Sequence, residues 1–444
     1  MKKIILLFSA VCLNILPSLA QKLSFGSPYS AFGLGDIQSQ TNGMQRAMGN
    51  IGVGFSDRLE TSWANPASSG WVRRTVFHMG MSGNWSQYAN SSTAITQNQF
   101  NLAHLGITLP VAKKGTFSAV ILPYTQNTYN IRNEIFDSSG NFSYRELYAG
   151  DGGINKVQAQ YAHVFKNRLS IGLAGSYLFG PIFREQFVIF PDTSGAFNLR
   201  LSDQYRVSDY SISAGAQYRI FWGDTSWGKW SKEANSLHST TIGVKYDQGR
   251  SLQTTREYLA VRYTTTTLGG TNVKDTLQFR YTQKDSSGTI GTPTSLGFGL
   301  VFEDFRHWMV GADFVKYDWS NASFFGGNSI YQSQSYGVHL GGYYIPNAFK
   351  GESFWERSTY RGGFRMFQTG MQFRGVNINE WAVTMGMTFA NRQKNNPLSG
   401  VTWALEMGQR GTIQSNLIRD RFVQLSLSFN LTDRFPWFVP SKYD

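Results

Sequence analysis

The stretch near the carboxyl end of the chain, residues 422–431, alternates between apolar and polar side chains. Every second residue from Val423 to Leu431 is apolar, and those between are Gln, Ser or Asn. Successive side chains of a β-strand point to opposite faces, so this strand has one apolar and one polar face. The same period recurs along most of the chain without a long apolar helix. The pattern predicts a closed barrel in lipid, because only helices and closed barrels satisfy their backbone hydrogen bonds within a bilayer.

The first twenty residues predict the compartment. Lys2 and Lys3 precede an apolar run from Ile4 to Leu16, and Pro-Ser-Leu-Ala follows. This order is typical of a secretory signal peptide over residues 1–20, cut after Ala20. A membrane anchor is the alternative, but the run is short for a spanning helix. Cys12, the single cysteine, is removed with this segment, so we expect no disulfide and no Cys-based metal site in the mature chain.

Composition separates the membrane classes. Mean hydropathy is −0.29, although 15% of the residues are aromatic. Barrels have such compositions, since only alternate residues face lipid and aromatic girdles lie at both interfaces. The formal charge is +13. With secretion, this charge favours anionic lipid headgroups and lipopolysaccharide as neighbours, and no nucleic acid.

Fourteen stretches have the length and alternation of barrel strands. They are residues 73–88, 98–111, 115–132, 154–166, 168–190, 203–222, 236–250, 293–305, 307–320, 331–346, 359–375, 378–391, 399–411 and 419–431. A soluble β-sandwich or propeller is the alternative, but no repeat of fixed period is present. A TonB-dependent transporter needs more strands than 444 residues supply beside a plug.

The connections give a second indication. Bacterial barrels have short periplasmic turns and longer external loops, and an even strand count returns both ends to the periplasm. The connections 133–153, 191–202 and 251–292 are long and polar, as external loops should be. Two connections, 223–235 and 347–358, are long on the supposed periplasmic side. We therefore predict an all-β transmembrane antiparallel barrel of about 14 strands in the outer membrane, over residues 71–431. Both termini are expected in the periplasm, including a carboxy-terminal tail, 432–444.

Residues 21–70 do not resemble barrel strands. The segment is rich in glycine, which permits tight turns and close backbone packing. It also carries more apolar surface than a disordered tail would. We therefore predict a hatch that folds inside the lumen. The candidate hatch or ligand-binding residues are Phe32, Gly33, Met44, Arg46, Met48, Phe55, Asn65, Pro66 and Ala67.

The order of this segment carries a family resemblance. A Gly-rich run ends in Gln-Arg-Ala-Met-Gly at residues 45–49, a spacer covers 50–64, Asn65-Pro66-Ala67 follows, and barrel strands come next. In this order the chain resembles the FadL-type transporters of hydrophobic compounds (OmpP1/FadL/TodX-like barrels). The resemblance implies a fourteen-stranded barrel and a passive path. An apolar, fatty-acid-like ligand would pass to a pocket above the hatch and leave sideways through a gap where a wall strand kinks.

Some residues are candidates for that path. Pro123, within the third predicted strand, marks either such a kink or a harmless bulge. Aromatic residues on or near this strand form either an entrance groove or an ordinary girdle with loop packing; they are Tyr124, Tyr129, Phe136, Phe142 and Tyr144. A fatty acid also needs a cationic partner for its carboxylate. The sequence does not choose among Arg46, Arg132, Arg184 and Arg206.

Enzymatic motifs are missing from the sequence. The six histidines, at 78, 104, 163, 238, 307 and 339, lack the spacing of a metal site, and no nucleophile elbow or P-loop occurs. We expect no enzyme, no cofactor and no metal.

Two interpretations of function follow. The leading one is a passive outer-membrane channel for hydrophobic compounds. The alternative is a FadL-like barrel that serves, without transport, as a subunit of an outer-membrane protein export or assembly complex with other outer-membrane proteins. The aromatic tail, the 251–292 connection and the 347–358 segment motivate this alternative.

Overall fold

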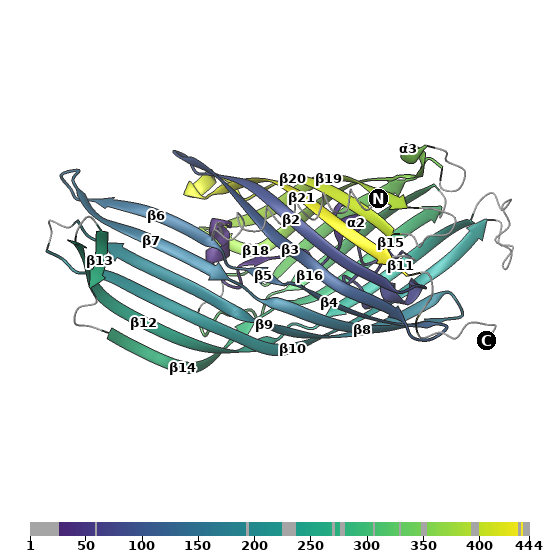
Figure 1. Ribbon diagram of the computed structural model, residues 1–444, viewed down its shortest axis with the longest axis horizontal. Helices are drawn as coiled ribbons and strands as arrows, with labels where there is room; N and C mark the ends of the chain where they lie inside the picture. The colour runs from purple at the N-terminus through teal and green to yellow at the C-terminus, as the bar shows by residue number, and fades with distance from the viewer. Residues whose placement is uncertain are drawn as a thin grey trace.

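The chain forms a closed antiparallel β-barrel (Figure 1). The computed structural model describes residues 26–57, 60–191, 195–223, 237–268, 271–275, 280–304, 307–327, 330–347, 353–391, 399–433 and 437. Within them, fourteen strands close the barrel, which confirms the predicted fold class and number. They are β2 (Val76–Ala89), β3 (Ala94–Pro110), β4 (Gly115–Pro123), β8 (Asn155–Phe165), β9 (Leu169–Ile189), β10 (Asn198–Gly223), β11 (Leu237–Asp247), β15 (Thr294–Asp304), β16 (Trp308–Asp318), β17 (Gln334–Tyr344), β18 (Thr359–Phe373), β19 (Val376–Asn391), β20 (Ser399–Arg410) and β21 (Arg419–Thr432).

The alternation read from the sequence becomes an outward and an inward face. On β19, Trp381, Val383 and Met385 are 45%, 48% and 47% exposed, whereas Ala382 and Thr384 between them are buried. The outward residues face lipid, and the inward ones contact material in the lumen. This two-sided environment is why period 2 predicts these strands well.

Exposed aromatic residues lie near both ends of the wall. Such rings favour the membrane interfaces, where one end of the side chain is apolar and the other is wet. Near the end with long connections the residues are Trp85, Tyr177, Tyr210, Tyr246, Tyr336 and Trp381. Near the other end they are Phe77, Tyr161, Tyr218, Trp222, Trp308 and Tyr344.

Two connections predicted as loops are wrong. The 133–153 connection contains the second half of β6 (Tyr129–Phe136) and all of β7 (Phe142–Gly152), and 251–292 contains β12 (Ser251–Leu268), β13 (Thr271–Asp275) and β14 (Arg280–Gly291). β7 pairs with β9, and β12 pairs with β10 and β14. We call the sheet formed by β6, β7, the outer halves of β9 and β10, β12 and β14 the extension sheet; it projects beyond the rest of the barrel (Figure 1). In these strands the outward residues are not regularly apolar, so the sequence lacks the alternation by which the wall strands were predicted.

The third predicted strand, 115–132, is also wrong as a single element. β4 ends at Pro123, and the next residues leave the wall to form β5 (Thr125–Gln126) before β6 begins. β5 pairs with β1 (Asp36–Ile37) of the amino-terminal segment. Proline has no N–H for the ladder, and the N–H groups of Tyr124 and Thr125 donate instead to Ile154 O at 2.8 and 3.0 Å.

The amino-terminal segment, defined here as residues 26–72, lies inside the barrel (Figure 1). It contains η2 (Pro28–Ala31), β1, α2 (Gly43–Arg46) and η3 (Pro66–Trp71). α2 contacts β19, β20 and β21, whereas η3 contacts β4, β8, β9 and β10. A buried apolar cluster joins Met44, Met48, Ile51 and Phe55 to Val301 and Met309 of the wall. The segment therefore adds a core to a fold whose lumen is otherwise polar.

The carboxyl end leaves β21 at Thr432. The Asp433 N–H donates to Thr75 O at 2.8 Å, and the Trp437 ring lies 5.7 Å from the Phe77 ring on the outer face of β2. Residues 1–20, predicted as a signal peptide, and most of the predicted tail lie outside the described residues. None of the helices in the described part is long and apolar enough to cross a membrane.

Candidate functional site: the segment-filled lumen

Three side-chain caps shape the turns of the amino-terminal segment. Ser27 Oγ accepts from the Tyr29 N–H at 3.3 Å, which begins η2. Asn42 Oδ1 accepts from the Gln45 N–H at 3.0 Å, and Gln45 Oε1 accepts from the Asn42 N–H at 3.2 Å. This reciprocal capping box starts α2 although that helix has only one turn. Each cap satisfies backbone donors that would otherwise be unpaired in the lumen.

One row of inward side chains holds the middle of the segment. Asp313 of β16, His339 of β17 and Arg365 of β18 are cross-strand neighbours. The Asp313 carboxylate accepts from three successive N–H groups of residues 52–54, at 2.6, 2.7 and 3.2 Å. His339 Nδ1 lies 2.9 Å from Gly49 O. The wall therefore binds the segment through its backbone, and a carboxylate bound by three N–H groups is a strong acceptor.

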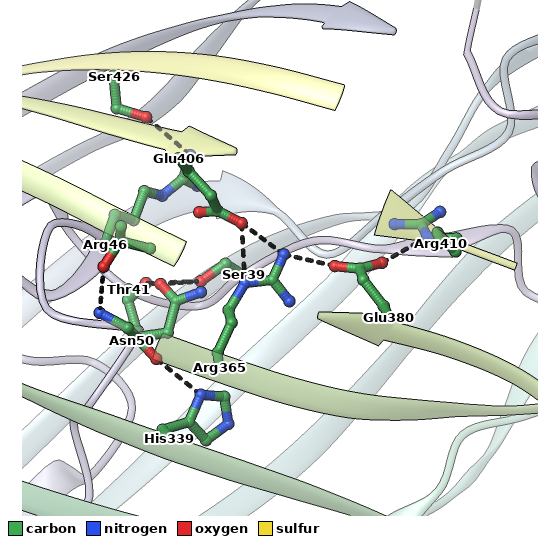
Figure 2. A network of polar contacts seen from close by, with 12 residues as sticks. Ser39, Thr41, Arg46, Asn50, His339, Arg365, Glu380, Glu406, Arg410 and Ser426 are labelled. Carbon is green, nitrogen blue, oxygen red and sulfur yellow. Dashed lines mark hydrogen bonds and ion pairs between the residues drawn. The ribbon is translucent and has the colours of Figure 1, made fainter. Parts of the chain in front are cut away.

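Charged side chains form a buried network above this row (Figure 2). Arg365 pairs with Glu380 of β19 and with Glu406 of β20, where the Nε–Oε1 distance is 2.8 Å. Glu380 also pairs with Arg410, whose Nη1 lies 2.8 Å from Asp36 Oδ1 in the segment. The network links three wall strands to β1. Burial raises the pKa of the Asp36 carboxyl, and Arg410 opposes that shift.

The Asn-Pro-Ala motif anchors the far end of the segment. Asn65 Nδ2 donates to Val53 O at 2.8 Å and to Val244 O of β11 at 3.2 Å, while its Oδ1 accepts from the Ala67 N–H at 3.0 Å. Pro66 is the first residue of η3, a position where its missing N–H costs nothing. A Cβ added at Gly215 of β10 would overlap Asn65 Oδ1, so the wall has a glycine where the motif approaches it.

Glu60, in the same segment, is 2% exposed. Burial raises the pKa of its carboxyl to about 8. The side chain is therefore protonated at neutral pH in the folded protein.

A cavity of about 280 Å³ lies between the segment and the outer half of the wall. Its lining mixes polar and apolar side chains; the amide and charged ones include Asn84, Gln99, Asn101, Gln126, Gln424, Lys156, Lys245 and Asp247. Lys245 Nζ lies 2.9 Å from Asp247 Oδ2, which also accepts from Ser295 Oγ at 2.6 Å. Tyr124, Tyr317, Trp319 and Tyr331 add aromatic surface.

The structure places the predicted hatch residues in one lumen but in different roles. Phe32 is 41% exposed and packs 4.7 Å from the Phe373 ring. Gly33 has φ +53°, and its carbonyl accepts from Arg184 Nη2 at 2.7 Å. Arg46 is buried, with Nη1 3.3 Å from Ser426 Oγ. Met44, Met48 and Phe55 are core residues. A gating role for these residues stays a prediction.

The candidate groove aromatics are not brought together. Tyr124 packs against the buried cluster around Leu34, and Tyr129 is 6% exposed at the start of β6. Phe136 and Phe142 contact each other at 6.2 Å in the β6–β7 hairpin, and Tyr144 contacts Phe190 at 5.6 Å. The aromatic candidates therefore belong to at least two separate places.

The cation candidates also separate. Arg132 pairs with Glu134, and Arg206 lies 3.6 Å from Glu257, both in the extension sheet. Arg184 lies 3.9 Å above the Phe324 ring. The network around Arg365 and Glu380 was missed by sequence reasoning. The sequence did contain a signal for this network, namely charged residues at inward positions of the spanning strands. A lumen filled only with water would not need such charges to pair with each other.

The histidines occupy unrelated places. His78 and His104 pack 5.5 and 4.9 Å from the Trp63 ring inside the barrel, and His238 stacks 4.6 Å from Trp222. Within the described ranges, no three His, Cys, Asp or Glu side chains are grouped to hold a metal ion.

Solved structures with a similar architecture include a FadL homologue and two toluene transporters. A Pseudomonas aeruginosa FadL homologue superposes with a TM-score of 0.60 at 11% identity, covering 89% of this chain and 99% of that chain. The toluene transporter TodX of P. putida superposes with a TM-score of 0.55 at 12% identity, covering 89% of this chain and 99% of that chain. The Ralstonia pickettii toluene transporter TbuX superposes with a TM-score of 0.54 at 14% identity, covering 91% of this chain and 99% of that chain. These values confirm the FadL-like fold of an outer-membrane barrel. No curated protein matches the sequence.

The sequence itself matches a family over its whole length. The profile of the BamG family covers residues 1–444. The match includes the luminal segment, the fourteen wall strands and the extension sheet. The chain is thus a FadL-like outer-membrane barrel and a member of the BamG family.

Proposed function

We propose that this barrel is a non-transport subunit of an outer-membrane protein assembly complex. The carrying observation is the way the lumen is filled. The wall side chains Asp313 and Gln217 bind backbone atoms of the segment, and Gln217 Nε2 donates to both Val53 O and Phe55 O, at 3.0 and 3.2 Å. In the opposite direction, Asn65 of the segment donates to Val244 O of the wall at 3.2 Å. Opening a passage would break many buried hydrogen bonds at once, each of which costs about 1–3 kcal/mol when its partner is lost.

The cavity lining supports the same proposal. An apolar ligand gains free energy by moving from water to an apolar surface. Polar and apolar groups line this cavity in similar measure, and the charged groups among them include the Lys245–Asp247 pair. The lining therefore lacks the predominantly apolar surface that would bind a hydrocarbon well.

Surfaces for partner proteins are available on the side with short connections. The short helix α3 (Phe354–Arg357) carries Phe354 and Trp355, which are 50% and 59% exposed. Trp437 is 52% exposed beside β2. Exposed aromatic residues are favoured at protein interfaces and at the membrane interface alike. The name of the family, BamG, also favours the assembly proposal over a small-molecule channel.

A passive channel for hydrophobic compounds is the second candidate. Its support is the likeness to FadL-type and toluene-transporting barrels and the break in the wall after Pro123. In this proposal the segment acts as a hatch, an apolar small molecule is the ligand, and the break provides a lateral exit. Both proposals place the chain in the outer membrane with lipid and lipopolysaccharide around it and both termini on the periplasmic side.

Gentle detergent extraction separates the two proposals. The protein is purified from native outer membranes, and co-purifying proteins and bound lipids are both identified by mass spectrometry. The assembly proposal expects stoichiometric outer-membrane partners and, on depletion of this chain, falling amounts of other outer-membrane barrels. A lone barrel carrying a fatty acid or hydrocarbon, with uptake of that compound lost on deletion, would overturn it in favour of the channel.

A further inference from the structure

The outer half of β3 has one unpaired edge. β3 pairs with β2 over its whole length, but it pairs with β4 only from Leu105 to Pro110. On the other side of this opening, β6 pairs only with β7. Among the described strands, none occupies the space between the outer half of β3 and β6, and the two strands run apart (Figure 1). We call this opening the β3–β6 slot.

Part of the slot lies at membrane depth. Phe100 and Leu102 of β3 point outward and are 57% and 51% exposed. Their partners across the ladder are Gly83 and Met81 of β2, on the barrel side of the girdle residue Trp85. Lipid tails offer no hydrogen bonds, so an uncovered strand edge at this depth costs several kcal/mol for each unsatisfied group.

The backbone groups that face the slot follow from the ladder. The Asn90 N–H donates to Thr93 O at 3.0 Å, which makes this pair hydrogen-bonded. Hydrogen-bonded and non-hydrogen-bonded pairs alternate along an antiparallel ladder. The residues that direct their N–H and C=O groups away from β2 are therefore Thr96, Asn98, Phe100 and Leu102.

The two faces beside this edge specify what fits there. Gln99 and Asn101 point inward and line the polar cavity, whereas Phe100 and Leu102 point outward to lipid. An added strand must therefore alternate between polar and apolar side chains in the same phase. Only a polypeptide also supplies the N–H and C=O groups that the edge lacks, which neither a hydrocarbon nor a lipid tail does.

We propose that the β3–β6 slot binds an amphipathic β-strand of another outer-membrane polypeptide, by backbone pairing with Thr96–Leu102 of β3. This inference rests on the proposed assembly function and locates one partner contact. The pairing completes the wall at the place where Tyr124–Asn127 turn inward to the amino-terminal segment and no longer follow β3.

The test is a proline at the free edge. Asn98→Pro removes one N–H that faces the slot and leaves the β2–β3 bonds of Gln97 and Gln99 in place. Asn98→Ala removes the same side chain but keeps the N–H, so it is the matched control. Each variant is purified from native outer membranes, and its partners are quantified by mass spectrometry beside wild type. The apparent size shift on heating in SDS gels reports whether each variant is folded.

We expect Asn98→Pro to lose at least tenfold of one partner that Asn98→Ala retains. A photo-crosslinker at position 98 should then join that same partner through an alternating strand, and one at Val310 on the opposite wall should not. Equal partner amounts in the two variants would overturn the inference. A crosslink to lipid alone would also overturn it, as would a crosslink to residues 21–25 of the same chain. Those residues directly precede Gly26, which lies beside Thr128. If Asn98→Pro does not fold, Thr96→Pro with Thr96→Ala replaces the pair. If wild-type protein is purified without any stoichiometric partner, the proposed function itself is wrong.

Discussion

The wall formed by β16–β20 and the wall formed by β3, β4 and β6 treat the amino-terminal segment in opposite ways. On the first side every strand keeps both neighbours, and inward charges hold the segment through Asp313, His339 and Arg410. On the second side, the chain that follows β4 leaves the wall. It forms β5, which pairs with β1 of the segment, and the outer half of β3 is left with an unpaired edge. A segment bound by side chains leaves the barrel closed, whereas one bound by backbone pairing opens it.

The largest effect is expected from the charged network. Arg365→Met leaves Glu380 and Glu406 buried without one of their cations, and breaking such a pair costs about 3–5 kcal/mol. We expect a large fall in the melting temperature of the refolded barrel in detergent, measured by circular dichroism. Arg132→Met breaks an exposed pair and should leave the melting temperature nearly unchanged. Similar melting temperatures for the two variants would contradict the structural role of the network.

A second prediction concerns the carboxylate beneath the segment. Asp313→Ala removes the acceptor for three N–H groups, and we expect about 3 kcal/mol of lost stability together with protease cleavage within residues 45–60. Asp318→Ala, at an exposed turn of the same strand, is the control. Limited proteolysis followed by mass spectrometry measures the difference. A segment that stays resistant in Asp313→Ala would contradict this role, because its other contacts would then hold it without the carboxylate.

A third prediction tests the approach of the Asn-Pro-Ala motif to the wall. Gly215→Ala places a methyl group against Asn65, and overpacking of this kind costs about 1–3 kcal/mol. Gly175→Ala, on the neighbouring β9, meets nothing within 4 Å and serves as the control. Thermal unfolding of both variants gives the comparison. Equal stability would mean that the motif is not tightly held against β10.

The last prediction is a pH dependence from Glu60. Its folded pKa is about 8, above the ordinary value of 4.5, so the folded state keeps a proton that the unfolded state releases. This group therefore lowers stability progressively as the pH rises from about 4.5 to 8. Glu60→Gln should remove that slope and raise the melting temperature at pH 8 more than at pH 5, by a few degrees. Parallel curves for the two proteins would exclude a buried, protonated Glu60.

Sequence reasoning was strongest where lipid is the neighbour. β19 and β21 were read from strict alternation, because lipid accepts only apolar outward residues and so imposes the pattern on every strand. It failed for β6, β7 and β12–β14, whose faces contact water and protein and need no apolar series. It marked Pro123 as a kink or a bulge but continued the strand to residue 132, because the inward turn depends on β1, which lies almost ninety residues earlier in the chain.

For the site, the sequence was a better guide to which residues are important than to the role of each one. Asn65, Pro66 and Ala67 anchor a turn as their types suggest, whereas Arg46 is buried with its Nη1 3.3 Å from a serine of the wall, Ser426. The pairing of Arg365 with Glu380 and Glu406 follows from the register of three strands, which no local pattern encodes.

The sequence by itself determined the class of fold, the number of wall strands and the presence of an irregular segment before them, because period 2 and its interruption are local properties of the chain. The tertiary structure alone decided the contents of the lumen, the extension sheet and the β3–β6 slot. Those features depend on which strand edges meet and on which inward charges face each other, and closure of the barrel sets both.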